Sequence, residues 1–208
     1  MLTNLTVKVP ILVVVFGLIM GFAENPPKND NHKANSNEWQ QLVYSNYSCL
    51  NDTSLSYDAF KQGLHGFYKL RAQGKLTNER YFTVVDFSQH SSRERLYVID
   101  TEKFDIVYKS LCSHGKNTGG EKAEYFSNKI GSLQSSLGFF IANETYSGKF
   151  ELAMRLDGLE YCNNNARDRG IVVHGAKYAS PEFMKKNENV LGRSYGCPAL
   201  PEKEAKEI

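Results

Sequence analysis

The chain has 208 residues, with 25 Lys and Arg, 23 Asp and Glu, and four Cys. This length suits a single domain with a substantial core. The formal net charge of +2 comes without a basic run or stripe, so nothing indicates a nucleic-acid surface, and we expect no nucleic-acid partner. The composition also excludes collagen, a coiled coil, a disordered tail and a disulfide-dense miniprotein.

The N-terminus has the pattern of an export signal. Lys8 precedes an apolar run at 11–22, which as a helix would rise about 18 Å against the roughly 30 Å of a bilayer core. The run ends in GFA at 21–23, a small-x-small sequence typical of signal-peptidase sites. We therefore expect residues 1–23 to be a cleaved signal peptide that leaves no stable membrane anchor. An uncleaved N-terminal anchor is the alternative, and either one exports the rest of the chain.

A polar spacer and a helix are expected next. Residues 24–38 are rich in Asn, Lys and Pro and almost free of apolar side chains, which is typical of a disordered spacer. We expect a single folded domain over 39–208, beginning near Trp39. Ser56 can cap a helix over 57–73. The apolar face of that helix would carry Phe60, Leu64 and Phe67 at helical spacing.

The pattern then becomes strand-rich. Runs of β-branched and aromatic residues predict strands at 81–87, 96–99 and 106–111. Alternation predicts a half-buried strand at 149–156, whose buried face would carry Phe150, Leu152, Met154 and Leu156. A short apolar strand at 171–173 would deliver His174 at its end. No internal repeat is visible, which excludes solenoids and propellers.

The chain contains four cysteines, at Cys49, Cys112, Cys162 and Cys197. Their spacing does not support a structural zinc site, and we expect no metal. In an exported protein an even number of cysteines allows disulfides, with three connectivities for four residues.

Cys197 differs from the other three because Gly196 precedes it and Pro198 follows it. A Gly-Cys turn would expose the thiol and let two successive backbone N–H groups face one oxyanion. A nucleophilic thiol needs a base nearby, and the best candidate is His174, which is followed by Gly175. From these residues alone, a structural thiol and a structural histidine remain the alternative.

Two ordered motifs resemble the active-site signature of the L,D-transpeptidases, the YkuD-type domain. VHGA at 173–176 is similar to the strand-borne His-Gly of that family, and RSYGCP at 193–198 is similar to its Ser-x-Gly-Cys turn. The similarity is closest to the divergent branch of murein L,D-transpeptidase catalytic domain proteins. Further stretches similar to that branch lie at 85–88, 95–100, 113–120, 126–129, 135–139 and 155–159. The resemblance runs from about residue 54 to the C-terminus.

The resemblance implies a mainly β fold with flanking helices, namely an L,D-transpeptidase (YkuD)-like β-sandwich of two mixed sheets with the Cys and His in a groove at one end. It implies an exported enzyme, in the periplasm or secreted and associated with the cell wall. The implied partners are peptidoglycan stem peptides, and no metal or organic cofactor is implied.

The resemblance also assigns the catalytic roles. Cys197 would attack the carbonyl between the third stem residue and the terminal D-Ala, and His174 would move the thiol proton to the departing amine. The carbonyl of Gly175 would hold the imidazole, and the N–H groups of Gly196 and Cys197 would form the oxyanion hole. The resulting thioester would pass to an amine in L,D-transpeptidation or to water in L,D-carboxypeptidation.

Four further residues are candidates for substrate binding: Arg193, Ser194, Tyr195 and Tyr178. Ser194 can hydrogen-bond within the turn. Arg193 can bind a stem carboxylate or be a solvated loop charge. The two tyrosines can line the pocket or belong to the core.

The chain departs from the family pattern in two places. Most L,D-transpeptidases have an Arg two residues after the nucleophile, where this chain has Ala199, and the charged helical start at 202–208 stops where relatives usually continue to a closing strand. Two alternatives therefore stay open: a catalytic domain truncated at its C-terminus, and a non-catalytic wall-binding homologue of the same fold. A third class, an exported zinc peptidase, lacks any His-rich ligand spacing.

The remaining cysteines are assigned by the need to keep Cys197 a thiol. We expect a disulfide between Cys112 and Cys162, while the pairing of Cys49 stays open. The sequence also leaves open the acceptor, the diamino acid of the stem and the oligomeric state.

Overall fold

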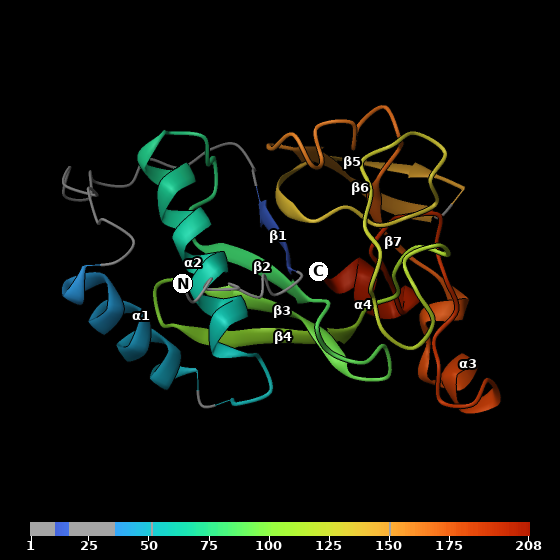
Figure 1. The fold of residues 1–208 in the computed structure, drawn as a ribbon, viewed down its shortest axis with the longest axis horizontal. Coiled ribbons are helices and arrows are strands. Elements are labelled where there is room, and N and C mark those ends of the chain that lie inside the picture. The colour runs from blue at the N-terminus through green and yellow to red at the C-terminus, as the bar shows by residue number, and fades with distance from the viewer. Residues whose placement is uncertain (1–10, 17–35, 51, 150) are drawn as a thin grey trace, which may run out of the picture.

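The computed structural model describes residues 11–16, 36–50, 52–149 and 151–208 (Figure 1). Within these residues the strands form one mixed sheet in the order β4-β3-β2-β1-β5-β6-β7-β8. Its strands are β1 (Ile11–Phe16), β2 (Tyr81–Asp86), β3 (Glu94–Asp100), β4 (Asp105–Leu111), β5 (Gly138–Gly148), β6 (Glu151–Gly158), β7 (Val172–Gly175) and β8 (Ala199–Leu200). Neighbouring strands run antiparallel except β1–β5 and β7–β8, which are parallel.

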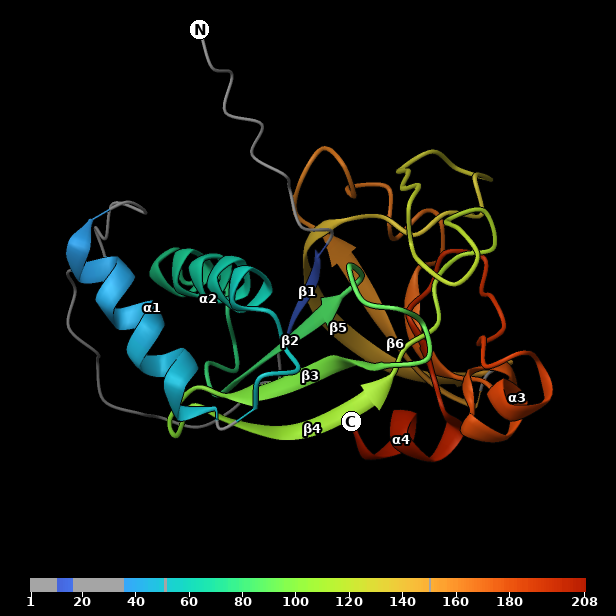
Figure 2. The ribbon, with the colours of Figure 1, turned by 60° about the horizontal axis from the view of Figure 1, so that its bottom comes forward.

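The expected mainly β architecture with flanking helices is confirmed. Two strand groups, β2–β4 and β5–β8, correspond to the two expected sheets, and β1 pairs with both groups. Figure 2 shows β6 crossing β3 and β4 at a steep angle. The facing sides of the two groups share a buried core that includes Val98 of β3, Leu156 of β6 and Val173 of β7.

Two helices cover the other face of the first strand group. They are α1 (Asn37–Cys49) and α2 (Tyr57–Ala72). The hydroxyl of Ser56 accepts a hydrogen bond from the backbone N–H of Ala59, which is the expected N-cap of the helix predicted at 57–73. The core between these helices and the sheet contains Trp39, Phe60, Leu64, Phe67 and Phe82.

The expected export signal lies partly in the sheet and partly outside the described residues. Ile11–Phe16, from the apolar run, forms β1, antiparallel to β2 and parallel to β5. The rest of residues 1–23, and residues 24–35 of the expected spacer, lie outside the described part, so cleavage of the signal stays a prediction. In the described part no helix has the length and apolarity needed to cross a bilayer.

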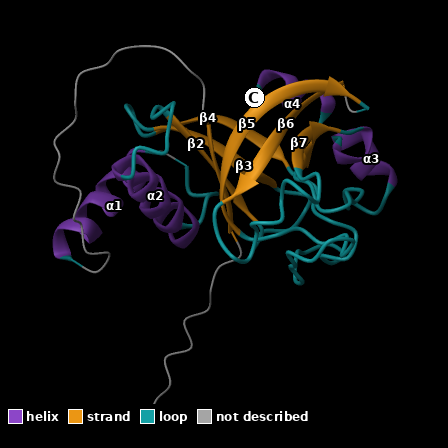
Figure 3. Ribbon diagram, turned by 90° about the horizontal axis from the view of Figure 1, so that it is seen from above, coloured by secondary structure: helices purple, strands orange, loops and turns teal. Residues whose placement is uncertain are grey.

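Short elements surround β7. These are the 3-10 turn η1 (Lys177–Ala179), α3 (Pro181–Lys186) and α4 (Glu202–Glu207). Helix α4 packs on β7 closely, because a Cβ added at Gly175 would lie 2.9 Å from the Cα of Glu202. Figure 3 shows the longest loops gathered beside β6 and β7, away from α1 and α2. This loop cluster contains the Cys197 turn at 193–198 and the glycine-containing loop at 113–120.

Candidate active site

His174 lies in strand β7, and Cys197 lies in the turn that leads into the neighbouring strand β8. In the parallel pair β7–β8, His174 lies opposite Ala199 and Gly175 lies opposite Leu200. Cys197 precedes Ala199 by two residues, so the thiol enters the site just before β8 begins. The strand pairing therefore places the two residues that the sequence singled out on adjoining segments of the chain.

A backbone carbonyl fixes the His174 ring. Its Nδ1 lies 2.9 Å from the carbonyl oxygen of Gly175. Because a carbonyl only accepts, Nδ1 carries the proton and the lone pair of the neutral ring lies on Nε2. Burial lowers the pKa of His174, and the hydrogen bond to Gly175 opposes part of this shift. The ring of Tyr178 meets the imidazole edge to face, with centroids 6.5 Å apart.

The Cys197 thiol is half-buried and lies 3.7 Å from the carbonyl oxygen of Gly170. Burial raises the pKa of the Cys197 thiol, while the backbone N–H of Val172 and the guanidinium of Arg169 act in the opposite direction. Since the imidazole pKa is lowered and the thiol pKa is raised, the resting pair is a neutral thiol and a neutral imidazole. Such a pair must transfer its proton during the attack on a carbonyl.

A closed turn presents this thiol. Ser194 donates through Oγ to the carbonyl oxygen of Cys197 at 2.6 Å, and the same Oγ accepts from the N–H of Gly196 at 3.1 Å. Ser135 donates to the carbonyl oxygen of Gly196 from the facing loop. Gly196 has φ +125°, and an added Cβ would lie 2.7 Å from the carbonyl oxygen of Gln134. The turn therefore requires glycine at this position.

Three expected substrate-binding residues have different surroundings, namely Arg193, Tyr178 and Tyr195. The guanidinium of Arg193 donates to the backbone carbonyls of Leu191, Gly192, Gly119 and Gly120, and so ties the 115–120 loop to the turn. Burial lowers the pKa of Arg193. Tyr178 packs against Gly192, whereas the ring of Tyr195 is 73% exposed.

Arg169 is the site residue that sequence reasoning missed. It donates to the backbone carbonyl of Ser127 at 2.8 Å and to Ser136 Oγ at 2.5 Å, and it also donates to the carbonyl of Gln134. These bonds hold the 127–136 loop beside the Cys197 turn. No local pattern distinguishes this Arg in the sequence, because every one of these partners is more than 30 residues away.

His114, the second histidine followed by glycine, belongs to a structural cluster. Its Nδ1 lies 2.6 Å from Nη2 of the buried Arg95, and its Nε2 lies 3.1 Å from the carbonyl oxygen of Gly119. Arg only donates, so Nδ1 accepts and the proton is on Nε2. Burial, with Arg95 and Arg193 nearby, lowers the pKa of His114 to about 3. With both ring nitrogens engaged, His114 is not placed to act as a base.

The expected disulfide between Cys112 and Cys162 is wrong, because all four cysteines are thiols in the structure. Cys112 is enclosed in the core between the two strand groups, and burial raises its pKa to about 12. Cys162 is exposed on a loop, where its Sγ donates to the carbonyl of Leu137. One sulfur thus lies inside the core and the other at the surface. The described residues contain no group of three or more His, Cys, Asp or Glu suited to a metal ion.

Comparison with known families gives one match. The family model described as the L,D-transpeptidase catalytic domain matches residues 51–208, a range that includes both His174 and Cys197. A comparison with curated proteins and one with solved structures found no match. The matched range begins just before α2 and includes β2–β8, so it covers every strand except β1 and all the loops around Cys197.

Proposed function

Because the chain belongs to the L,D-transpeptidase catalytic domain family, we propose that it is an exported cysteine acyltransferase acting on peptidoglycan stem peptides. The observation that carries this proposal is the 2.9 Å hydrogen bond from His174 Nδ1 to the carbonyl of Gly175. That bond directs the basic Nε2 lone pair away from the backbone of β7, which pairs with the segment following Cys197.

The reaction begins with attack of Cys197 Sγ on the carbonyl carbon between the third stem residue and D-Ala. His174 Nε2 takes the thiol proton as the S–C bond forms, then gives it to the amine of D-Ala as the C–N bond breaks. D-Ala leaves and a thioester remains on Cys197. An incoming amine or water then loses its proton to His174 and releases the acyl group.

The oxyanion of each tetrahedral intermediate needs donors. We assign this role to the backbone N–H groups of Cys197 and Gly196, a contribution of about 3–4 kcal/mol per donor in related chemistry. The N–H of Gly196 donates to Ser194 Oγ in the resting turn. During catalysis it would therefore be shared between that hydroxyl and the oxyanion.

The amine acceptor gives a cross-link between stems, and water gives L,D-carboxypeptidase trimming. Either reaction requires peptidoglycan, so we propose export to the periplasm or the cell wall after cleavage of residues 1–23, a cleavage that would remove β1 from between β2 and β5. The signal-like apolar run at 11–22 supports export.

A second candidate function is wall binding without catalysis. It is favoured by Ala199, which occupies the position of the usual Arg, and by the raised pKa of Cys197. The two functions differ in one respect only, since a binding protein would hold stem peptides without cleaving them.

Product analysis on purified muropeptides separates the two. We expect wild-type protein to release D-Ala from tetrapeptide stems, with cross-linked or tripeptide products, and Cys197→Ala to release none. His174→Gln should retain binding but lose most turnover, because the amide cannot take the thiol proton. Binding of muropeptides with unchanged stems by folded wild-type protein would favour the non-catalytic function instead.

A further inference from the structure

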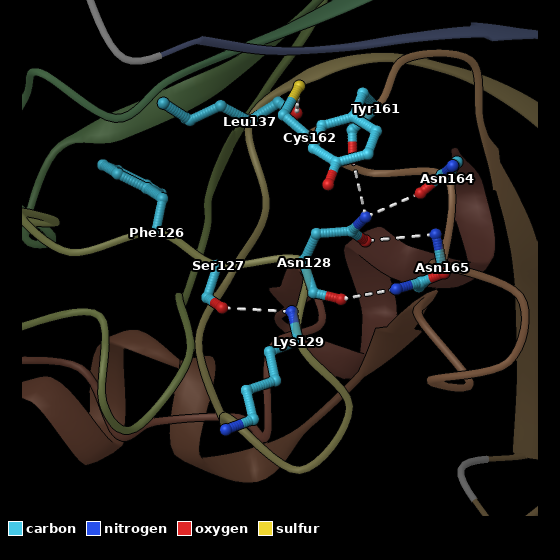
Figure 4. A pocket seen from close by; sticks show the side chains of 9 residues that line it. All are labelled: Phe126, Ser127, Asn128, Lys129, Leu137, Tyr161, Cys162, Asn164 and Asn165. Atoms are coloured by element: carbon cyan, nitrogen blue, oxygen red, sulfur yellow. Dashed lines mark hydrogen bonds between the residues drawn. The ribbon is translucent and has the colours of Figure 1, made fainter.

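A cavity lies near the catalytic turn. It has a volume of about 580 Å³, within the range usual for small-molecule sites. Its wall comes from two loops, the β4–β5 connection and the β6–β7 connection (Figure 4). The lining residues are Phe126, Ser127, Asn128, Lys129, Leu137, Tyr161, Cys162, Asn164 and Asn165. His174, Ser194 and Cys197 are not among them.

Three asparagines in this cavity hold one another in place. Asn128 donates through Nδ2 to the carbonyl of Tyr161 at 2.8 Å and to Asn164 Oδ1 at 2.7 Å. Its Oδ1 accepts from the N–H of Asn165 at 3.1 Å, and its backbone carbonyl accepts from Asn165 Nδ2. Figure 4 shows these amides side by side along one wall. The network fixes the direction of each amide before a ligand arrives, which lowers the entropy cost of binding.

The lining indicates an uncharged polar ligand. Lys129 is the one charged lining residue, and no lining carboxylate could hold a cation. Within this network Asn164 keeps its Nδ2 donor and Asn165 its Oδ1 acceptor, as a ligand with several hydroxyl or acetamido groups requires. A multiply charged anion would need more cations than this wall offers.

An exposed aromatic ring completes the site. Tyr161 is 92% exposed at the edge of the cavity, and Tyr125 and Ile130 on the facing loop are each 63% exposed. Rings exposed to this degree bury little within the chain and are available to a ligand. Tyr combines an apolar face with a polar hydroxyl, so it suits the C–H face of a pyranose ring next to hydrogen-bonding amides.

The loop that lines this cavity also supports the catalytic turn. Ser127 lines the cavity, and its carbonyl accepts from Arg169 at 2.8 Å. Arg169 in turn donates to the carbonyl of Gln134, against which Gly196 packs. The cavity is therefore a neighbour of the proposed acylation site rather than a remote surface feature.

We propose that this cavity is a subsite for N-acetylated sugar residues of the peptidoglycan glycan strand. The identity of the glycan rests on the proposed function, because a stem peptide reaching Cys197 carries the sugar chain at its other end. Sugar bound here would contribute binding energy remote from the reacting carbonyl. A stem attached to sugar should therefore have a lower KM than the same stem as a free peptide.

The cavity contains its own reporter, the exposed thiol of Cys162, and α1 supplies a matched one in the exposed thiol of Cys49. We would measure alkylation rates at both thiols by peptide mass spectrometry, with tetra-N-acetylchitotetraose as the probe. The Cys197→Ala protein is used, so the measurement needs no turnover. A failed sugar test and a failed enzyme test are then distinguishable.

We expect the probe to slow alkylation of Cys162 several-fold and to leave Cys49 unchanged. Tyr161→Ala should raise the half-protecting concentration about tenfold, whereas Tyr161→Phe should keep it near the wild-type value. Tyr44→Ala, an exposed tyrosine on α1, serves as the control and should have no effect.

Three results of the protection assay would overturn the proposal. The first is no protection of Cys162 by millimolar probe. The second is equal protection in Tyr161→Ala and wild type. The third is protection by a sugar-free stem tetrapeptide equal to that by the sugar, which would make the cavity a peptide site. As a second readout, Tyr161→Ala should raise KM for a disaccharide-linked stem relative to the free tetrapeptide, and an unchanged ratio contradicts the proposal.

Discussion

The hydroxyl of Ser194 donates a hydrogen bond to the backbone carbonyl oxygen of Cys197 over 2.6 Å. The same hydroxyl accepts from the N–H of Gly196, so one side chain closes the turn from both sides. The turn leads directly into β8, the strand that pairs with the His174 strand. Ser194 thus determines where the thiol lies relative to the imidazole.

Ser194→Ala should therefore weaken both the fold and the chemistry. We expect a loss of about 1–3 kcal/mol in the free energy of unfolding, because the buried N–H of Gly196 and the part-buried carbonyl of Cys197 lose their partner. Acylation of Cys197 should slow by about tenfold or more, since small displacements of a nucleophile are costly. Chemical denaturation and acylation rates check this. Ser48→Ala, which removes an exposed hydroxyl bond on α1, is the control. Acylation at the wild-type rate in Ser194→Ala would contradict the role of the turn.

Gly196→Ala should damage the catalytic turn far more than a substitution at an open loop glycine would. The methyl group would lie 2.7 Å from the carbonyl oxygen of Gln134, at a φ of +125° that L-residues rarely adopt. We expect either unfolding or a displaced turn without acylation. Gly120→Ala is the matched control, because no atom lies within 4 Å of the added methyl group. The comparison uses thermal unfolding of the two variants, and equal stability would be inconsistent with this packing.

Arg169 should set the reactivity of the thiol. Burial raises the pKa of Cys197, and Arg169 counteracts part of that shift. Alkylation by iodoacetamide should therefore keep rising with pH beyond the range of an ordinary thiol, and Arg169→Gln should move its midpoint further upward. Arg169→Lys should partly restore the wild-type midpoint. Arg167→Gln, which breaks only surface ion pairs with Glu144 and Asp157, should leave the midpoint unchanged.

His114 should make the fold acid-sensitive. Its pKa is lowered from 6.5 to about 3 by burial, so between these pH values the unfolded chain binds a proton that the folded chain does not. Its contribution to stability is complete above pH 6.5 and is lost as the pH falls, at about 1.4 kcal/mol per unit. Urea unfolding across this range should show a shallower pH slope for His114→Gln than for wild type. Equal slopes would show that His114 is not buried in the neutral form.

Local sequence patterns were sufficient to predict the helices and strands in which such a pattern occurs. Ser56 and three apolar residues at helical spacing predicted α2, and β-branched runs predicted β2, β3 and β4 within a few residues. Strand β5 was missed because its sequence mixes polar and apolar residues, and β8 because two residues carry no periodicity.

Burial along β6 shows where alternation misleads. Leu156 is buried as expected, but Leu152 on the same predicted face is 39% exposed. Strand β7 pairs only with Ala153–Arg155 of β6, so Leu152 lies beyond the end of its neighbour. Strand length, which the sequence of β6 does not encode, decides which apolar residues find a partner.

The site residues also fall into those that a local motif reveals and those that only long-range contacts reveal. Cys197 and His174 each lie next to a glycine in a short motif and could be singled out together with Gly175. The contact of Arg169 with the 127–136 loop comes from chain segments far apart in sequence. The disulfide was mispredicted because cysteine count and compartment say nothing about which sulfur the core encloses.

The central claim is that Cys197 forms a thioester with a stem peptide. The most direct test is the intact mass of the protein during incubation with a stem tetrapeptide, followed by peptide mapping of the adduct. We expect addition of the tripeptidyl group at Cys197, with loss of D-Ala, and no adduct in Cys197→Ala. A folded wild-type protein that gains no mass, or that carries the adduct on Cys49 or Cys162, would contradict it.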